Sequence, residues 1–414
     1  MRRLLSIILF VLTFTVNAQN YITIQGKVIS NNKPVVFANI TIKNQPIGTV
    51  SNEFGMFEFH IPDSLKNKTF IISCIGYYNF EKKLNKINKN DSVFELKQRD
   101  IELDEVIVLP KDKTAKDIVE LALHNIKKNY SKKQHYLEGF YREISYTNAI
   151  AKRVIESAIQ IQEYGAKKNN LKDRIKVFQL RKSDDQSEYN WWAKKMVKYV
   201  FGERTSLYEA YNSFDFINIK VNKQLIKKCK FEYLEPTIID SSIVYKIKFS
   251  YPSHHNNSLS YGYLYINIDD YAIIKIEKYT KSTNDFLKMI LGKNKTYLDK
   301  TVRIYKKYKG KYYLNFLYVY GIFYEGEEVT KTKKPQKEAY ITINRIITKK
   351  RDYERIRLKN MEKRDVRLYE QEFKYDPQFW KNYNILIANP IATKTKKELE
   401  KEKQLETQFK ENSK

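Results

Sequence analysis

The sequence has 414 residues, 42% hydrophobic and 14% aromatic, which is enough for two or three packed domains of roughly 150 residues each and excludes a disordered chain. Lys and Arg number 76 against 48 Asp and Glu, a formal net charge of +28, so polyanionic partners have to be considered. Two cysteines and five histidines exclude a disulfide framework and leave little for a multi-histidine metal site.

Residues 1–18 are expected to be a cleaved secretory signal peptide. Arg2 and Arg3 form a positive start, residues 4–16 are nearly all apolar, and small residues precede Gln19 at the cleavage position. The run is too short to anchor the chain in a bilayer about 30 Å thick. It is also the only long apolar run, so we expect an exported protein with no transmembrane span after cleavage.

Export also guides the interpretation of the positive charge. Exported proteins rarely meet nucleic acid, so we expect no nucleic-acid partner, and the lysines are scattered along the chain rather than gathered on one element. Lys, Asn, Ile and Tyr are abundant throughout, as an AT-rich genome would also produce. Compositional bias is therefore favoured over a dedicated polyanion site, while contact with anionic lipid or polysaccharide stays open.

Residues 19–98 are predicted to form a seven-stranded β-sandwich, because short apolar strands alternate with turn signals. Val36, Ala38, Ile40 and Ile42 keep strict period two, which is typical of a strand buried on one face. Residues 70–75 are apolar except for Ser73, which indicates a central strand.

The turns of this segment carry a series of short motifs. They are Gly26-Lys27-Val28, Pro34-Val35, Ala38-Asn39-Ile40, Gly48-Thr49, Ser51-Asn52-Glu53, Gly55-Met56-Phe57 and Gly76-Tyr77. In this order and spacing they resemble the carboxypeptidase regulatory-like domain, a transthyretin-like sandwich. That domain is also an N-terminal extension of TonB-dependent outer-membrane receptors, and residues 101–108, within an expected linker at 99–113, resemble the segment that joins the extension to the receptor plug.

A receptor barrel of about 22 strands needs more chain than the roughly 300 residues that remain. The chain therefore resembles the stand-alone carboxypeptidase-like regulatory proteins of Gram-negative bacteria. This resemblance implies a location in the periplasm or at the outer membrane, and a partner that is an outer-membrane or surface protein, a glycan or a lipid.

Residues 114–390 are predicted to form an α+β domain with one large curved antiparallel sheet and few helices, so that the fold class is mainly β. Thr114 and Asp117 form a capping-box pattern at the start of a helix at 114–130. A second helix is expected at 187–201, with Trp191 and Trp192 as core and rim residues. Eight strands are predicted, at 136–146, 154–164, 243–251, 262–268, 272–279, 302–308, 312–320 and 340–347.

Asp269-Asp270 and Lys309-Gly310 are expected to be hairpin turns within this sheet. Its concave face is expected to be rich in Tyr, Phe and Ile. The alternating segment 262–269 resembles the half-barrels of periplasmic lipoprotein carriers. Tyr263 and Tyr265 on this segment are therefore candidate ligand or partner contacts.

The end of the chain has two features. Residues 376–384 are interpreted as a clasp that packs Phe379 and Trp380 on the sheet, with a binding role for Trp380 as the alternative. Residues 391–414 are rich in Lys and Glu and are interpreted as a charged tail, either a solvated helix or frayed.

Cys74 and Cys229 are interpreted as two small buried side chains, with a bridge between them as the less favoured alternative.

One pattern is typical of an enzyme. His135 and Glu138 form H-x-x-E, the first zinc-ligand pair of metallocarboxypeptidases, and His254 lies at about the spacing of the third ligand. In a strand, however, positions i and i+3 point to opposite faces. The regulatory domain also precedes this region, whereas it follows the catalytic domain in those enzymes. No other catalytic motif occurs, so we expect no catalytic residues, metal or cofactor.

The sequence thus favours a non-enzymatic exported envelope protein whose sandwich is an interaction module. The alternatives are a periplasmic carrier of an apolar or lipid ligand on the curved sheet and, less favoured, a zinc carboxypeptidase.

Overall fold

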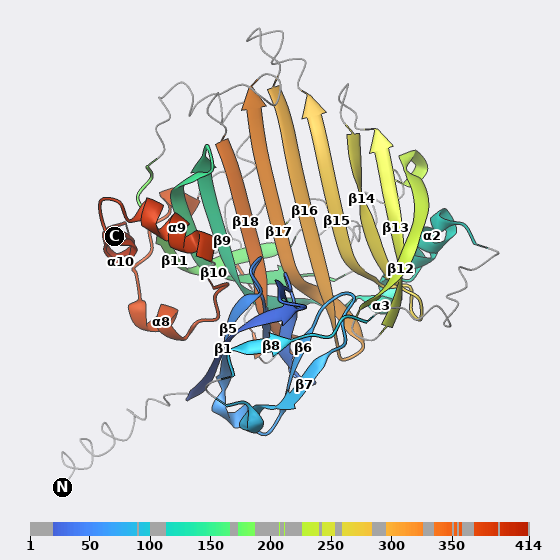
Figure 1. Cartoon of the computed structure of the whole chain (residues 1–414), viewed down its shortest axis with the longest axis horizontal. Helices are drawn as coiled ribbons and strands as arrows, with labels where there is room; N and C mark the ends of the chain where they lie inside the picture. Colours follow the sequence, from blue (N-terminus) through green and yellow to red (C-terminus); the bar gives the residue numbers. More distant parts are fainter. Residues whose placement is uncertain are drawn as a thin grey trace.

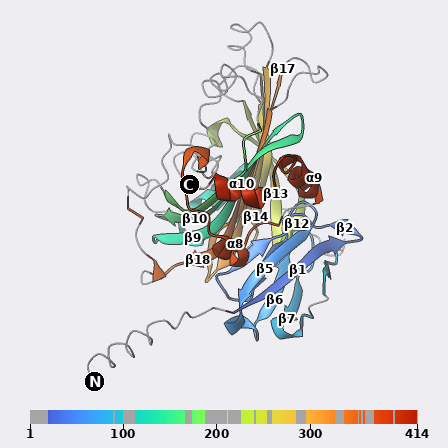
Figure 2. The same cartoon turned by 90° about the vertical axis from the view of Figure 1, so that its left-hand side faces the viewer.

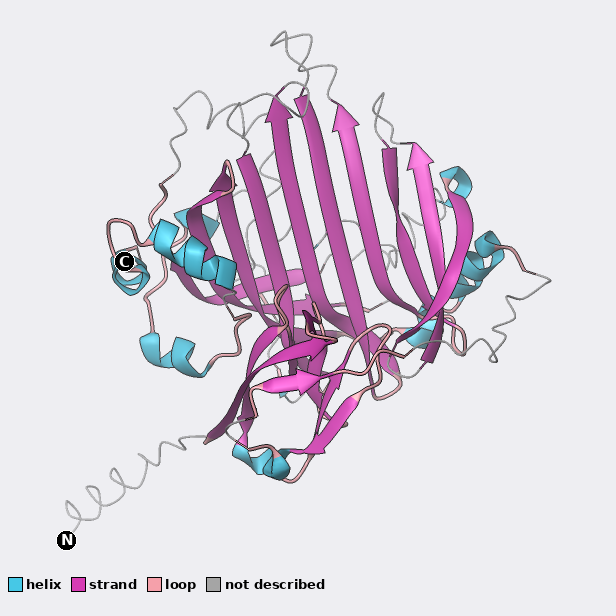
Figure 3. Ribbon diagram, viewed as in Figure 1, coloured by secondary structure: helices cyan, strands magenta, loops and turns pink. Residues whose placement is uncertain are grey.

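The computed structural model shows a mainly β protein with few helices (Figure 3), which confirms the predicted fold class. It describes residues 20–88, 91–99, 113–165, 173–186, 207, 211, 226–239, 242–252, 259–283, 295–325, 335–349, 352–353, 356–357, 368–387 and 390–412. The expected signal peptide, most of the expected linker and the predicted helix at 187–201 with both of its tryptophans lie outside these residues.

Eight strands form the N-terminal β-sandwich. They are β1 (Tyr21–Ser30), β2 (Lys33–Pro34), β3 (Asn39–Ile42), β4 (Gly48–Val50), β5 (Met56–Pro62), β6 (Thr69–Ser73), β7 (Phe80–Lys83) and β8 (Val93–Glu95). One sheet has the order β2-β1-β5 with β8 parallel to β1, and the other has the order β4-β3-β6-β7. The structure has one strand more than predicted, because a strand of two residues such as β2 has no alternation to reveal it.

Aromatic rings fill the space between the two sheets. Phe57, Phe70 and Phe94 are each at most 2% exposed, and their ring centroids are 5.4–6.2 Å apart. Gly55 turns the chain into β5 at φ +76°, where a Cβ would lie 2.2 Å from the Val28 carbonyl oxygen. This turn of the sandwich therefore requires glycine.

A ten-stranded antiparallel sheet forms the rest of the described core (Figure 1). Its order is β11-β10-β9-β18-β17-β16-β15-β14-β13-β12. The strands are β9 (His135–Thr147), β10 (Ile150–Glu163), β11 (Arg174–Lys182), β12 (Lys230–Ile239), β13 (Ser242–Pro252), β14 (Leu259–Asn267), β15 (Ile273–Thr283), β16 (Lys295–Tyr308), β17 (Lys311–Glu325) and β18 (Pro335–Ile347). All eight predicted strands of this domain are found, and Lys309 and Gly310 close the β16–β17 hairpin with positive φ of 47° and 74°.

The two strands that were not predicted, β11 and β12, are the edges of the sheet. Strand β12 contains Pro236, which a central strand would not tolerate, and its pairing with β13 is irregular at that point. Strand β11 carries Arg and Lys at several positions, as edge strands often do. Both features weaken the apolar alternation on which the prediction relied.

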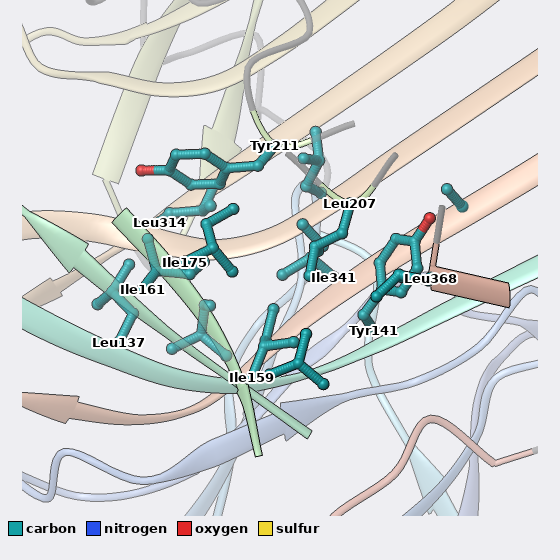
Figure 4. Close-up of a cluster of buried hydrophobic side chains, with 14 of the residues drawn as sticks. Leu137, Tyr141, Ile159, Ile161, Ile175, Leu207, Tyr211, Leu314, Ile341 and Leu368 are labelled. Carbon is teal, nitrogen blue, oxygen red and sulfur yellow. The ribbon is translucent and has the colours of Figure 1, made fainter. Parts of the chain in front are cut away.

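The sheet is strongly curved. Residues from β11 to β17, such as Ile175 and Leu314, line one side of it and belong to one buried cluster (Figure 4). Figure 2 shows the β9–β11 end curling away from the sandwich. The concave face therefore lies on the side opposite the sandwich.

Helix α2 (Ala115–His124) and the short α3 (Ile126–Asn129) lead into the sheet. The Thr114 hydroxyl accepts a hydrogen bond from Asp117 N (3.2 Å), and the Asp117 carboxylate accepts one from Thr114 N (2.7 Å), so the predicted capping box is confirmed. Ile118 and Val119 are fully buried in a cluster with residues of β13 and β14. None of the described helices is long and apolar enough to cross a membrane.

The sandwich packs directly on the large sheet. Ile346 N donates to the Pro46 carbonyl oxygen (2.9 Å), and Ile47 forms an antiparallel bridge with Arg345. The rings of Phe37 and Phe316 are 4.6 Å apart. These contacts fix the sandwich against β17 and β18, while the domain boundaries at 19–98 and 114–390 stay predictions.

Asn384 closes the free edge of β5. Its side-chain oxygen accepts from His60 N (2.7 Å), and its side-chain nitrogen donates to the His60 carbonyl oxygen (3.2 Å). The Asn384 side-chain amide thus makes the two hydrogen bonds that the backbone of a neighbouring strand would make with His60. A segment more than 300 residues away in sequence thereby holds the sandwich in place.

Replacing Asn384 with alanine is expected to lower the free energy of unfolding by about 1–3 kcal/mol, because it leaves a buried backbone donor and acceptor without partners. Urea unfolding of the mature protein measures this. Asn382→Ala is the matched control, because Asn382 is exposed and has one long hydrogen bond of 3.5 Å to Gln378 O. Equal losses in the two variants would contradict the prediction.

The C-terminal segment differs from the expected solvated or frayed tail. Helices α9 (Pro390–Leu399) and α10 (Leu405–Glu411) pack beside β10 and β11, and Leu399 and Phe409 are 1% and 6% exposed. The side-chain amide of Gln408 donates to Leu399 O (2.8 Å) and its oxygen accepts from Asp184 N (2.9 Å). A few apolar side chains, together with Gln408, anchor a segment that is rich in Lys and Glu.

Candidate functional site

His135 lies in a buried polar cluster. Strands β9 and β10 place it directly opposite Glu163, whose Oε2 is 2.8 Å from His135 Nε2. The Tyr211 hydroxyl donates to Glu163 Oε1 (2.6 Å) and lies 3.1 Å from Asp173 Oδ2. His135 Nδ1 donates to the Lys133 carbonyl oxygen (3.1 Å). Both ring nitrogens are therefore engaged within the protein.

The electrostatics favour a charged pair. Burial opposes protonation of His135, but Glu163 outweighs it and raises the pKa of the imidazole. Burial opposes ionisation of Glu163, but the hydrogen bond from His135 lowers the pKa of that carboxyl. Burial and the neighbouring Asp173 and Glu163 raise the pKa of Tyr211 well above its ordinary value. These shifts favour an imidazolium–carboxylate pair beside a neutral phenol, which suits a structural link between β9 and β10.

Glu138 has different neighbours from His135. Its Oε1 accepts from Gln160 Nε2 (3.4 Å), and its Oε2 lies 3.9 Å from Arg345 Nη1. The third zinc-ligand candidate, His254, lies outside the described residues. Among the described residues no group of three or more His, Cys, Asp or Glu side chains is arranged to hold a metal ion.

The concave face carries a large apolar cluster. Isoleucine and leucine predominate, and Leu207, Tyr211 and Leu368 from outside the sheet pack into it (Figure 4). Leu207 is fully buried and Leu368 is 3% exposed. The chain's own side chains thus occupy the surface on which an apolar ligand would have to lie.

Tyr263 and Tyr265 lie on the other face of the sheet, the one that contacts the sandwich. Tyr265 is buried in a cluster that includes Ile75 of the sandwich, whereas Tyr263 is half-buried. Lys246 Nζ is 5.4 Å from the Tyr263 ring centroid and 5.9 Å from that of Tyr265. Only Tyr263 of the two candidates is therefore placed to contact a partner.

Trp380 packs as the clasp interpretation describes. It lies on α8 (Pro377–Asn382), which begins at Asp376, whose carboxylate accepts from Gln378 N and Phe379 N (both 3.0 Å). Its side chain is 5% exposed in a cluster with Phe140 and Phe316. The Arg181 guanidinium lies 4.3 Å from the ring centroid, so the ring covers a buried arginine.

Cys74 and Cys229 do not form a disulfide. Cys229 borders the cluster around α2, and burial raises its pKa to about 12. A thiol in that state is not a reactive nucleophile at neutral pH.

The sandwich carries most of the exposed large hydrophobic side chains among the described residues. The described residues have five exposed large hydrophobic side chains, and four of them lie on the sandwich. These four are Tyr21, Val36, Tyr78 and Val93; Tyr78 and Val93 are 51% and 57% exposed. The alternation that places Val36 on a buried strand face is wrong at this residue, because β3 begins only at Asn39 and Val36 precedes it, 40% exposed. For the other three, strand alternation alone does not say which outward positions stay uncovered.

The fold defines a two-part β protein, in which a small sandwich is docked on one side of a large curved antiparallel sheet. The family model of the CarboxypepD_reg-like domain matches residues 24–108. The N-terminal sandwich is therefore a CarboxypepD_reg-like domain, which confirms the resemblance drawn from its turns.

Other comparisons add little. No curated protein matches the sequence. One similar solved structure is a putative outer membrane lipoprotein-sorting protein domain from Vibrio parahaemolyticus, with 9% identity over 58% of this chain and 97% of that one, at a TM-score of 0.24. Another is a DUF1329 family protein from Desulfovibrio piger, with 10% identity, 54% and 90% coverage and a TM-score of 0.23. Similarity at TM-scores this low supports no conclusion about the fold or the function of this chain.

Proposed function

We propose that this is a non-enzymatic exported envelope protein that binds an outer-membrane protein through its CarboxypepD_reg-like sandwich. The observation that carries the proposal is the concentration of exposed apolar side chains on the sandwich. Contiguous exposed apolar patches mark protein-binding surfaces, and these four side chains are the candidates for such a patch on the sandwich.

The docking of the sandwich supports this role. Contacts with β17, β18 and Asn384 hold it firmly on the large sheet, so a partner would meet a surface that is already ordered. Binding to a preorganised surface requires less loss of conformational entropy than binding to a mobile domain. The large sheet acts in this proposal as the scaffold.

The two alternatives have less support. A carrier would need room on the concave face, where Leu207, Tyr211 and Leu368 are packed. A zinc peptidase would need His135 to release either Glu163 or the Lys133 carbonyl, because one ring nitrogen has to face the metal.

Site-specific photo-crosslinking in the native host tests the proposal. A photoreactive amino acid at Tyr78 or Val93 is expected to give a discrete covalent product that contains an outer-membrane protein. The matched control is Lys66, a polar position on the same sandwich whose side chain is 58% exposed, and it is expected to give no such product. No product at Tyr78 and Val93, or the same products at Lys66, would refute the proposed role.

A further inference from the structure

A row of tyrosines crosses the sheet on the sandwich side. The pairing of Tyr261 with Tyr279, of Tyr279 with Lys300 and of Val302 with Tyr318 puts these side chains on one face. Tyr318 contacts Phe37 of the sandwich, with ring centroids 5.9 Å apart. In Figure 1 these strands extend above the sandwich with no described element in front of them.

Three rings on β14 and β15 are in contact, and Lys300 on β16 lies between them and Tyr318. Tyr261 and Tyr279 are stacked with centroids 5.2 Å apart and planes 15° apart, and Tyr263 meets Tyr279 edge-on at 6.4 Å. Tyr261, Tyr263, Tyr279 and Tyr318 are all half-buried. Each of these residues is therefore partly accessible to solvent.

Two lysines lie among these rings. Lys300 Nζ is 5.6 Å from the Tyr279 centroid and 6.0 Å from the Tyr318 centroid, and Lys246 lies over Tyr263. In the part of the chain that the structure describes, no carboxylate pairs with either lysine, whereas Lys275 nearby is paired with Glu277. The surface thus combines aromatic rings with two lysines that no described carboxylate pairs with, while the Glu277 carboxylate on the same face pairs with Lys275 and accepts a hydrogen bond from the Tyr279 hydroxyl (3.4 Å).

We propose that this tyrosine–lysine face binds an acidic polysaccharide. The apolar faces of sugar rings would pack on the tyrosines, and sugar carboxylates would pair with Lys246 and Lys300. The site lies on the large sheet, and the proposal does not depend on the proposed protein partner of the sandwich.

Charge and shape favour a glycan over a protein at this face. Without Arg2 and Arg3 of the expected signal peptide the net charge is still +26, from 74 Lys and Arg against 48 Asp and Glu, and it attracts a polyanion from a distance. Protein interfaces instead rely on apolar anchors buried in pockets, and the exposed apolar anchors of the described residues lie mostly on the sandwich.

Binding of the full mature protein to polygalacturonate, a carboxylated glycan, tests the proposal by isothermal titration calorimetry, with neutral dextran as the comparison polymer. We expect polygalacturonate to bind at low salt, more weakly as ionic strength rises, and dextran to bind at least tenfold more weakly. The double variant Lys246→Gln/Lys300→Gln is expected to weaken binding at least tenfold. Glutamine keeps most of the side-chain stem over the rings, and thermal unfolding confirms that the variant is folded.

The matched control removes the same charge elsewhere, as Lys43→Gln/Lys116→Gln, two lysines whose side chains are more than half exposed. It is expected to change the affinity less than twofold. Tyr261→Ser is a second, independent variant, expected to weaken binding at least fivefold without a change of charge. Equal losses in the two lysine pairs, no binding of polygalacturonate, or capture of a protein through this face would overturn the proposal.

Discussion

Replacing Glu156 with glutamine is expected to lower the free energy of unfolding by about 3–5 kcal/mol, because it leaves buried arginines without a counter-ion. Glu156 is 5% exposed and Arg142 is 7% exposed. Arg142 Nε donates to Glu156 Oε1 and Arg181 Nε to Oε2, both at 2.6 Å. Arg181 is also enclosed by the rings of Trp380 and Phe409, so it cannot turn to solvent without displacing the clasp and α10.

The same triad predicts a dependence of stability on pH. Burial alone would raise the pKa of Glu156, but Arg142 and Arg181 outweigh it and lower the pKa to about 2. The carboxyl has a pKa of about 4.3 in the unfolded chain. The stabilisation that the ionised Glu156 gives the folded state is therefore complete above that pH and is lost as the pH falls toward 2. Glu156→Gln is expected to lack this part of the acid sensitivity of the wild-type protein.

Urea unfolding at pH 7 and at pH 3 measures both effects. Glu81→Gln is the control, since Glu81 pairs with Lys43 at the surface with 40% of its side chain exposed, and a loss below about 0.5 kcal/mol is expected there. A loss below 1 kcal/mol for Glu156→Gln would show that the triad does not need its carboxylate.

The sequence predicts those parts of the fold that follow from local patterns. The strands β13–β18 alternate clearly, and the turn at Lys309-Gly310 has the chemistry of a hairpin. The turns of the sandwich are specific enough to identify its family. The edge strand β12 is missed because Pro236 interrupts its pattern.

The candidate sites depend on contacts that no local pattern encodes. Glu163 reaches His135 only through the register of the β9–β10 hairpin, which includes a bulge. Burial of Tyr265 follows from the side on which the sandwich docks, and that side is set by contacts such as Phe37 with Phe316. Leu399 and Phe409 are single apolar residues in a charged segment, so their burial depends on a surface formed by β10 and β11.

The interface between sandwich and sheet also contains a buried lysine. Lys306 on β16 is 8% exposed, and its Nζ has no hydrogen-bond partner among the described residues. A Cβ on Gly48 of the sandwich would lie 2.9 Å from this nitrogen, so the ammonium lies against β4. Burial lowers the pKa of Lys306 to about 8.

Replacing Lys306 with methionine is therefore expected to stabilise the protein at pH 7, by about 3 kcal/mol at most. The unfolded lysine has a pKa of about 10.4 and binds its proton more tightly than the folded one, so this lysine destabilises the folded state. This destabilisation of the folded state by Lys306 is complete below pH 8 and disappears as the pH rises toward 10.4. The advantage of Lys306→Met over the wild-type protein is expected to shrink across the same range.

Thermal or urea unfolding between pH 7 and pH 10 measures this difference. Lys307→Met is the matched control, because Lys307 is the adjacent residue, has a half-exposed side chain and pairs with Asp270 at 2.8 Å. It is expected to leave stability unchanged or slightly reduced. If Lys306→Met were less stable than the wild-type protein at pH 7, the ammonium would be contributing to the attachment of the sandwich rather than opposing it.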